Sequence, residues 1–224
     1  MIEFSSQNDK NELFELWKTC FGDDDDYIRF FLENRFNPDR TLIKRIGDSI
    51  ISMLFLLEGE VSVSGEKYKS FYIYAACTHP DFRKQGHMES LINAAKRFAA
   101  KTSVDFISLV PASENLFSYY SKFGFVTAFK KKEITVTRRQ LMLMASKGAE
   151  SSSPDIKEIH RLRNRVLSST DCFLWDENAI NYAIKENEMT NGKTVFASAD
   201  NLLCGYALFH EIKGAALVHE ICFI

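Results

Sequence analysis

The sequence predicts an α/β fold in which a mixed, largely antiparallel sheet is flanked by helices. Three observations lead to this prediction. Strand-like apolar segments and segments of helical periodicity follow one another in the order β, α, α, β, β, β, α, β, α, β. A basic, glycine-containing turn joins one of these strands directly to a helix. After a break rich in serine, the order α, α, β, β, β occurs a second time.

The composition is that of a globular protein and excludes several function classes. The 224 residues suffice for one large domain or two small ones, and 46% of them are hydrophobic. The formal net charge of −2 gives no basic field of the kind that binds nucleic acid or an anionic membrane. The longest apolar run, residues 50–57, is too short to span a bilayer, and the N-terminal residues lack the apolar core of a signal peptide.

The five cysteines are widely spaced and form no CxxC pair. This pattern argues against a zinc site or a disulfide framework, and it favours free thiols in a reducing cytoplasm. The run Asp23 to Asp26 stands at the start of a predicted helix, where negative charge complements the helix dipole. A linear acidic run does not by itself bring ligands together in space, so we expect no metal site there.

The first half of the chain carries most of the predicted elements. A helix capped by Asn8 or Asp9 runs to Phe21 and ends at Gly22. The other elements before residue 80 are a strand at 2–4, a helix at 27–35, and strands at 41–46, 49–58 and 70–77, with a turn at 47–48 and a connection at 60–67. Next come a helix at 87–102, a strand at 104–110, a short helix from 113 or 114 to 123, and a strand at 126–136.

The second half repeats the first in shorter form. Residues 144–154 have linker composition, and they separate a predicted domain at 1–143 from a partial repeat at 155–224. The repeat contains helices at 155–168 and 176–189 and strands at 193–199, 204–211 and 215–224. It stops where the first copy reaches its basic turn, so we expect only one such turn in this chain. Whether the chain is truncated after Ile224 or buries its last strand in a sheet is left open.

The turn from Arg83 to Met88 follows the strand that ends near Thr78 and opens a helix. Free N–H groups at a helix start attract anions, and glycine lets the backbone approach a phosphate closely. The turn therefore predicts a phosphate-binding site, and the alternative is an ordinary solvated turn that carries two cations.

Two motifs carry a resemblance to a known family. The run Arg83-x-x-Gly86-x-Met88 after a strand resembles motif A of the GCN5-related N-acetyltransferases (GNAT), Q/R-x-x-G-x-G/A. The run from Tyr120 through Gly124-Phe125 resembles the end of motif B, Y-x-x-x-G-F, and the two motifs occur in the family's order. The resemblance covers residues 1–140 and, more weakly, a degenerate second copy. It extends to Eis-like tandem acetyltransferases, without their C-terminal sterol-carrier-like domain.

The resemblance implies acetyl-coenzyme A as co-substrate. Met88 stands where the motif has a small residue, which leaves the backbone donors but changes the fit against the pyrophosphate. The residues implied in cofactor binding are the amides of Gln85, Gly86, His87 and Met88, the cations Arg83 and Lys84, and the backbone of Ala76, Cys77 and Thr78, which would pair with the pantetheine arm. Asn115 would bond pantetheine amides or, alternatively, serve the start of its helix.

The resemblance also implies a catalytic residue. Tyr120 occupies the place of a tyrosine that protonates the leaving thiolate, and its alternative role is packing. Cys77 would lie beside the thioester, where a small buried residue is favoured over a covalent acetyl carrier. No general base is identified. Distant or indirect alternatives are Glu58, Glu60, His79, His87 and a chain of waters.

The sequence thus predicts an N-acetyltransferase that moves the acetyl group of acetyl-CoA to a primary amine by direct attack. The acceptor would be a small molecule or a peptide, and a homo-oligomer remains open. The alternatives are an acyltransferase that uses another acyl donor and a non-catalytic acyl-CoA-binding sensor.

Overall fold

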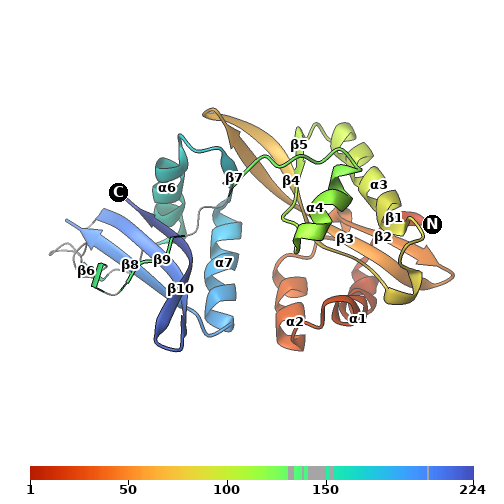
Figure 1. The fold of residues 1–224 in the computed structure, drawn as a ribbon, viewed down its shortest axis with the longest axis horizontal. Helices are drawn as coiled ribbons and strands as arrows, with labels where there is room; N and C mark the ends of the chain where they lie inside the picture. The colour runs from red at the N-terminus through yellow and green to blue at the C-terminus, as the bar shows by residue number, and fades with distance from the viewer. Residues whose placement is uncertain (131–133, 138, 141–149, 152–153, 201) are drawn as a thin grey trace. The chain divides into compact units, whose positions relative to one another are not determined.

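A computed structural model describes residues 1–130, 134–137, 139–140, 150–151, 154–200 and 202–224 (Figure 1). The chain divides into two compact units. The first comprises Met1–Val61 and Glu66–Val126, and the second comprises Ser62–Gly65 and Thr127–Ile224. Most of the predicted linker at 144–154 lies outside the described residues.

The described elements before residue 126 follow the predicted order. They are β1 (Ile2–Phe4), α1 (Lys10–Phe21), α2 (Asp25–Asn34), β2 (Thr41–Ile46), β3 (Ser49–Val63), β4 (Glu66–Thr78), α3 (His87–Lys101), β5 (Phe106–Ser108) and α4 (Glu114–Ser121). The strands form a sheet in the order β1-β2-β3-β4-β5, in which β1–β2 and β2–β3 are antiparallel and β4–β5 is parallel. The predicted mixed, mostly antiparallel sheet is therefore confirmed.

Residues 50–56 of β3 are all buried, and successive residues of a strand point to opposite faces, so both faces of this sheet are covered; helices lie on both (Figure 1). On one face, α3 packs its small and aliphatic residues against the sheet in a core of Leu42, Leu54, Leu56, Phe71, Ile73, Leu91, Ala95 and Ala99. On the other face, Trp17 of α1 and Phe31 of α2 meet Phe55 of β3, with ring centroids 4.9–5.6 Å apart. The predicted helix stop at Gly22 is confirmed, since Gly22 adopts a φ of 71° and closes α1.

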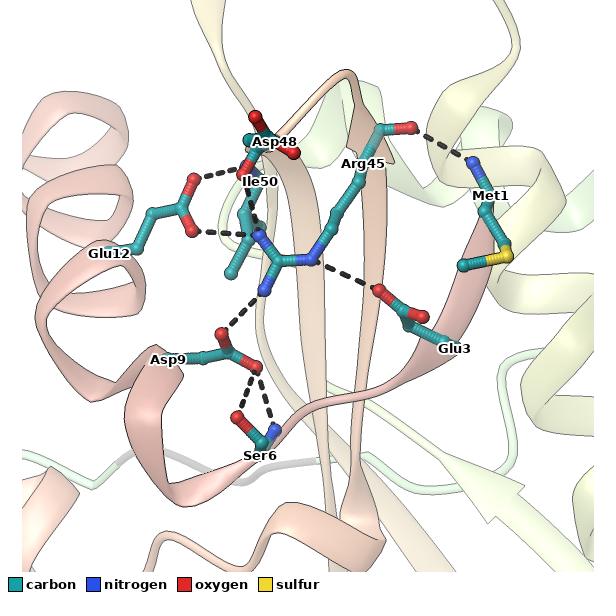
Figure 2. A network of polar contacts seen from close by, with 8 residues as sticks. All are labelled: Met1, Glu3, Ser6, Asp9, Glu12, Arg45, Asp48 and Ile50. Carbon is teal, nitrogen blue, oxygen red and sulfur yellow. Dashed lines mark hydrogen bonds and ion pairs between the residues drawn. The ribbon is translucent and has the colours of Figure 1, made fainter.

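A polar network fixes the N-terminal strand and α1 to the β2–β3 turn (Figure 2). The guanidinium of Arg45 donates hydrogen bonds to Glu3 at 3.0 Å, to Glu12 at 2.9 Å and to Asp9 at 2.5 Å. Its Nη1 also donates to the Asp48 carbonyl at 2.8 Å. Because one cation holds a carboxylate of β1 and two at the start of α1, this network is expected to stabilise the first unit.

The β3–β4 hairpin is longer than predicted. Both strands continue through the segment that was predicted as a connection at 60–67, and the turn itself is confined to Ser64 and Gly65, with φ of 54° and 85°. Two consecutive positive φ values suit the right-handed twist of a tight hairpin. An ion pair between Glu60 and Lys67 at 3.7 Å adds a cross-strand contact.

The second unit contains the predicted two helices and three strands in their predicted order, with two short strands in addition. Its elements are β6 (Glu150–Ser151), α6 (Ile156–Leu167), β7 (Cys172–Leu174), α7 (Glu177–Met189), β8 (Lys193–Ala199), β9 (Leu202–Ile212) and β10 (Ala215–Phe223). A sheet in the order β10-β9-β8-β6 packs on a core of Ile159, Leu162, Ile180, Tyr206, Leu208 and Cys222. The turn at Lys213 and Gly214 has φ of 46° and 81°, which matches the turn at Ser64 and Gly65.

One predicted element is wrong in the part of it that is described. Residues 126–130 and 134–136 form no strand, although their sequence alternates. Val126 and Ile134 are 84% and 71% exposed, so no apolar face is buried there to hold the segment against a sheet. The short strands β6 and β7 were not predicted. No helix in the described ranges combines the length and the apolar character that crossing a bilayer requires.

Candidate active site

The end of β4 departs from regular strand geometry. Its parallel pairing with β5 ends at Tyr72 opposite Ser108, although β4 itself continues to Thr78. Between these points Ala75 adopts a φ of 44°, a left-handed conformation that is uncommon for a residue other than glycine. The strand therefore separates from β5 before the segment Ala76 to Thr78, and an extended ligand could pair with that edge.

Hydrogen bonds hold this separated segment from the opposite side. The buried hydroxyl of Ser52 on β3 donates to the Cys77 carbonyl at 2.8 Å and lies 2.8 Å from the Thr78 hydroxyl. The amide of His79 donates to the Ile51 carbonyl at 2.8 Å and extends the pairing with β3. The end of β4 is thus held from its β3 side, which leaves the β5 side for a ligand.

The turn between β4 and α3 presents unpaired amides. Lys84 and Gly86 adopt φ of 62° and 75°, and Gly86 is the N-cap of α3. The amides of Gln85, Gly86, His87 and Met88 donate no hydrogen bond to any group in the described part of the chain. Unsatisfied N–H groups at the start of a helix make a site for an anion.

The side chains of the turn differ in what they can offer an anion. Lys84 is exposed and has no partner among the residues described here. Arg83 turns back toward the strand, and its Nε donates to the Thr78 carbonyl at 3.1 Å. Gln85 donates weakly to the Asp81 carbonyl at 3.4 Å. Lys84 is therefore the cation that is best placed for phosphate, and Arg83 chiefly braces the strand end.

Met88, which stands where motif A has a small residue, is accommodated by its packing. Its side chain contacts the core cluster between α3 and the sheet, as does that of Ala76. A side chain that points into the core does not stand in front of the amides. The larger residue in this motif position therefore leaves the anion-facing side of the turn open.

Neither histidine beside the turn is arranged as a base. The His79 ring accepts from the Asp81 amide at 3.4 Å and caps the short 3-10 turn η3 (Pro80–Phe82), which makes it a turn residue. Both ring nitrogens of His87 are buried without a hydrogen-bond partner among the described residues. Burial, with the charge of Lys44 second, lowers the pKa of His87, so its ring is neutral at pH 7.

Tyr120 and Tyr119 face different neighbours, as expected for adjacent residues of a helix. Tyr119 interacts with Glu89 of α3, while Tyr120 interacts with Tyr72 of β4 and packs on Phe125 with ring centroids 5.7 Å apart. Burial, followed by the neighbouring tyrosines, raises the pKa of Tyr120. Its hydroxyl therefore keeps its proton at neutral pH and can donate it in a hydrogen bond.

Asn115 lies in the first turn of α4 and is exposed. Its side chain makes no hydrogen bond within the described ranges, so the structure shows no capping bond from it. A role for Asn115 toward a ligand stays a prediction. Glu58 and Glu60, the distant base alternatives, form ion pairs with Arg40 at 2.6 Å and with Lys67 at 3.7 Å.

Two residues beside the site were not selected from the sequence. Tyr72 receives a hydrogen bond from the Val110 amide and lies near Tyr120. Strand alternation could have placed Tyr72 on the same face of β4 as Tyr74. Cys20 of α1 lies against Cys77 and Arg83, and no local sequence signal indicates that contact.

Comparison with solved structures gives likenesses over the whole chain. They include a conserved protein of unknown function from Enterococcus faecalis V583 (13% identity, TM-score 0.77), a GCN5-related N-acetyltransferase from Kribbella flavida (13%, 0.73) and Eis1 from Mycobacterium abscessus (11%, 0.71). Each covers 100% of this chain, while this chain spans only 58–59% of theirs. At such low identity these likenesses show the fold alone. No curated protein matches the sequence.

The first unit also matches a known sequence family. The model of an acetyltransferase (GNAT) domain matches residues 2–128, which is more than half of the 224-residue chain. The matched stretch contains the separated end of β4, the turn with unpaired amides, and α4 with Tyr120. On this match, the chain belongs to the GNAT acetyltransferase family.

Proposed function

We propose that this chain transfers the acetyl group of acetyl-CoA to a primary amine, and that the site lies between the end of β4 and α4. The observation that carries the proposal is the turn from Arg83 to Met88. Its amides from Gln85 to Met88 have no acceptor among the described residues, at a point where β4 has already separated from β5. A pyrophosphate and an amide-bearing arm need these two features side by side.

Acetyl-CoA fits the donors that the chain presents. The amides of Gln85 to Met88 and the free ammonium of Lys84 would hold the pyrophosphate. The β5-facing edge of Ala76 to Thr78 would pair with the pantetheine. Amides of that edge would also polarise the thioester carbonyl when it develops negative charge. Asn115 is a further donor to the pantetheine amides.

In the proposed reaction, the neutral amine nitrogen attacks the thioester carbon, the C–S bond breaks, and coenzyme A leaves as a thiolate. Tyr120 donates a hydrogen bond to that sulfur. The pKa of an ordinary tyrosine already exceeds that of an ordinary thiol, about 8.5, and burial raises the pKa of Tyr120 further. Complete proton transfer from the phenol to the thiolate is therefore uphill. The hydroxyl therefore stabilises the departing thiolate, while much of the rate comes from holding amine and thioester together.

Binding and turnover can be measured separately. Isothermal titration of the reduced chain with acetyl-CoA should give saturable binding. A thiol-release assay over polyamines, aminoglycosides and peptide amines should then show release with at least one amine class. Absence of acetyl-CoA binding would overturn the proposed site, and propionyl-CoA preferred over acetyl-CoA would point to another acyl donor.

One observation favours a second candidate, a non-catalytic acyl-CoA sensor. His79 caps a turn, the ring nitrogens of His87 are buried, and Glu58 and Glu60 are held in ion pairs, so none of these named bases is arranged to deprotonate an amine. Binding of acetyl-CoA without thiol release on any amine would support the sensor.

A further inference from the structure

Two thiols meet beside the proposed site. Cys20 lies near the end of α1, which packs against β4, and its thiol is close enough to that of Cys77 for the two to interact. Both cysteines are free. Cys77 is only 7% exposed, whereas Cys20 is partly exposed. Cys20 is therefore the more accessible residue of the pair.

A fixed cation lies against the pair. Arg83 is held by its hydrogen bond to the Thr78 carbonyl at 3.1 Å, and its guanidinium charge acts on the Cys20 thiol. The interaction with Cys77 lowers the pKa of Cys20 most, burial opposes this, and Arg83 adds to the lowering, which brings the value to about 7. Burial raises the pKa of Cys77. One thiol is thus activated while its neighbour stays protonated.

We propose that Cys20 and Cys77 form a peroxide-sensitive dithiol, in which Cys20 is the reacting sulfur and Cys77 resolves it into a disulfide. The contact of the two thiols, the unequal access and the braced guanidinium are the features on which this rests. The oxidant class is a hydroperoxide, for which hydrogen peroxide is the simplest probe.

The chemistry balances in two steps. The Cys20 thiolate attacks one oxygen of hydrogen peroxide and the O–O bond breaks. With one proton taken up, the products are a sulfenic acid on Cys20 and water, and the sulfur has lost two electrons. The Cys77 sulfur then attacks the Cys20 sulfur and displaces hydroxide, which accepts the Cys77 proton and leaves as water. The product is a Cys20–Cys77 disulfide.

The bond would change the segment that the proposed function assigns to the cofactor. Cys77 lies between Ala76 and Thr78, and Arg83 would lose its thiolate partner. Oxidation is therefore expected to weaken acetyl-CoA binding, and this consequence alone rests on the proposed function.

The test treats the full folded chain with hydrogen peroxide at pH 7, blocks free thiols and maps the peptides by mass spectrometry. A Cys20–Cys77 cross-link that dithiothreitol reverses is expected. Cys77→Ser should let dimedone trap a sulfenic acid on Cys20, and Cys20→Ser should give neither product. Cys20 should react roughly tenfold faster than Cys172, whose pKa burial raises, because about half of Cys20 is thiolate at this pH.

Cys172→Ser is the matched control and should leave the cross-link intact. Oxidation of Cys20 no faster than that of Cys172, or oxidation of Cys20 without the cross-link, would overturn the proposal. Titration with acetyl-CoA separates the two proposals. Reduced wild type and Cys20→Ser should bind equally, and peroxide should weaken only wild type. If the reduced chain binds no acetyl-CoA, the proposed function fails while the peptide map still decides on the dithiol.

Discussion

The hydroxyls of Tyr27 and Tyr74 lie 2.6 Å apart in a hydrogen bond that joins α2 to β4. The Tyr74 ring also stacks on Phe31 of α2, with centroids 5.0 Å apart and an interplanar angle of 20°. Tyr74 immediately precedes Ala75, where the backbone of β4 turns left-handed. The helix pair is thereby tied to the strand at the point where it begins to leave β5.

Tyr74→Phe should remove this hydrogen bond and keep the ring stacking. We expect the free energy of unfolding to fall by about 1 kcal/mol, measured by urea denaturation. Tyr27→Phe should show a similar loss, and the double variant should lose little more than either single one. Fully additive losses would mean that the two hydroxyls do not depend on each other.

Tyr120→Phe should lower kcat for acetyl transfer by roughly 10²-fold, since the leaving sulfur loses its hydrogen-bond donor. Acetyl-CoA affinity should change little. Tyr119→Phe is the control, because Tyr119 faces Glu89 on α3 and should retain its activity. Because burial raises the pKa of Tyr120, its contribution should persist up to pH 10 and disappear only above it. Equal effects of both substitutions would remove Tyr120 from the reaction.

Gly86→Ala should weaken acetyl-CoA binding about tenfold. An added Cβ meets only Glu89 Oε2, at 3.9 Å, so the effect comes from the φ of 75°, which disfavours other residues by about 1–2 kcal/mol. Gly47→Ala is the matched control, with a φ of 57° and open space around it in the β2–β3 turn. It should lose similar stability in thermal unfolding without losing affinity.

Arg45→Ala should destabilise the chain by about 2 kcal/mol at pH 7, because three carboxylates lose their shared cation (Figure 2). Lys67→Ala, which breaks an exposed pair with Glu60, should change stability by less than about 0.5 kcal/mol. A loss from Lys67→Ala as large as that from Arg45→Ala would contradict this assignment.

The Arg45 effect should depend on pH with a definite sign. Burial would raise the pKa of Asp9, but hydrogen bonds from Ser6 and Arg45 outweigh it and hold the pKa below its usual value. A depressed carboxyl pKa stabilises the fold above the unfolded value of about 3.9 and loses this effect as pH falls through the folded value. The difference in unfolding free energy between wild type and Arg45→Ala should therefore be largest near neutral pH and shrink in acid.

The regular elements could be predicted because their sequence patterns are local. The strands β2 and β8 were predicted with correct bounds, and α3 and α7 to within a residue at each end. The extension of the β3–β4 hairpin could not be predicted, because the polar residues at 60–67 are typical of a loop. Only the folded hairpin brings Glu60 and Lys67 together across the two strands. The segment 126–136 alternates like a strand, but strand formation also needs a partner edge, which local pattern does not supply.

The candidate site shows the same division. The turn from Arg83 to Met88 could be located by its glycine and its place between strand and helix. The left-handed Ala75 could not, because alanine carries no preference for that conformation. The contact of Cys20 with Cys77 depends on how α1 packs on β4, which no motif encodes.

The number of acetyl-CoA molecules bound per chain tests the central claim most directly. One turn, from Arg83 to Met88, is expected to hold the cofactor, and the partial repeat contains no equivalent sequence. Isothermal titration of the reduced chain should give a stoichiometry of one, with affinity reduced in Gly86→Ala. No binding, two molecules per chain, or affinity unchanged in Gly86→Ala would contradict the account.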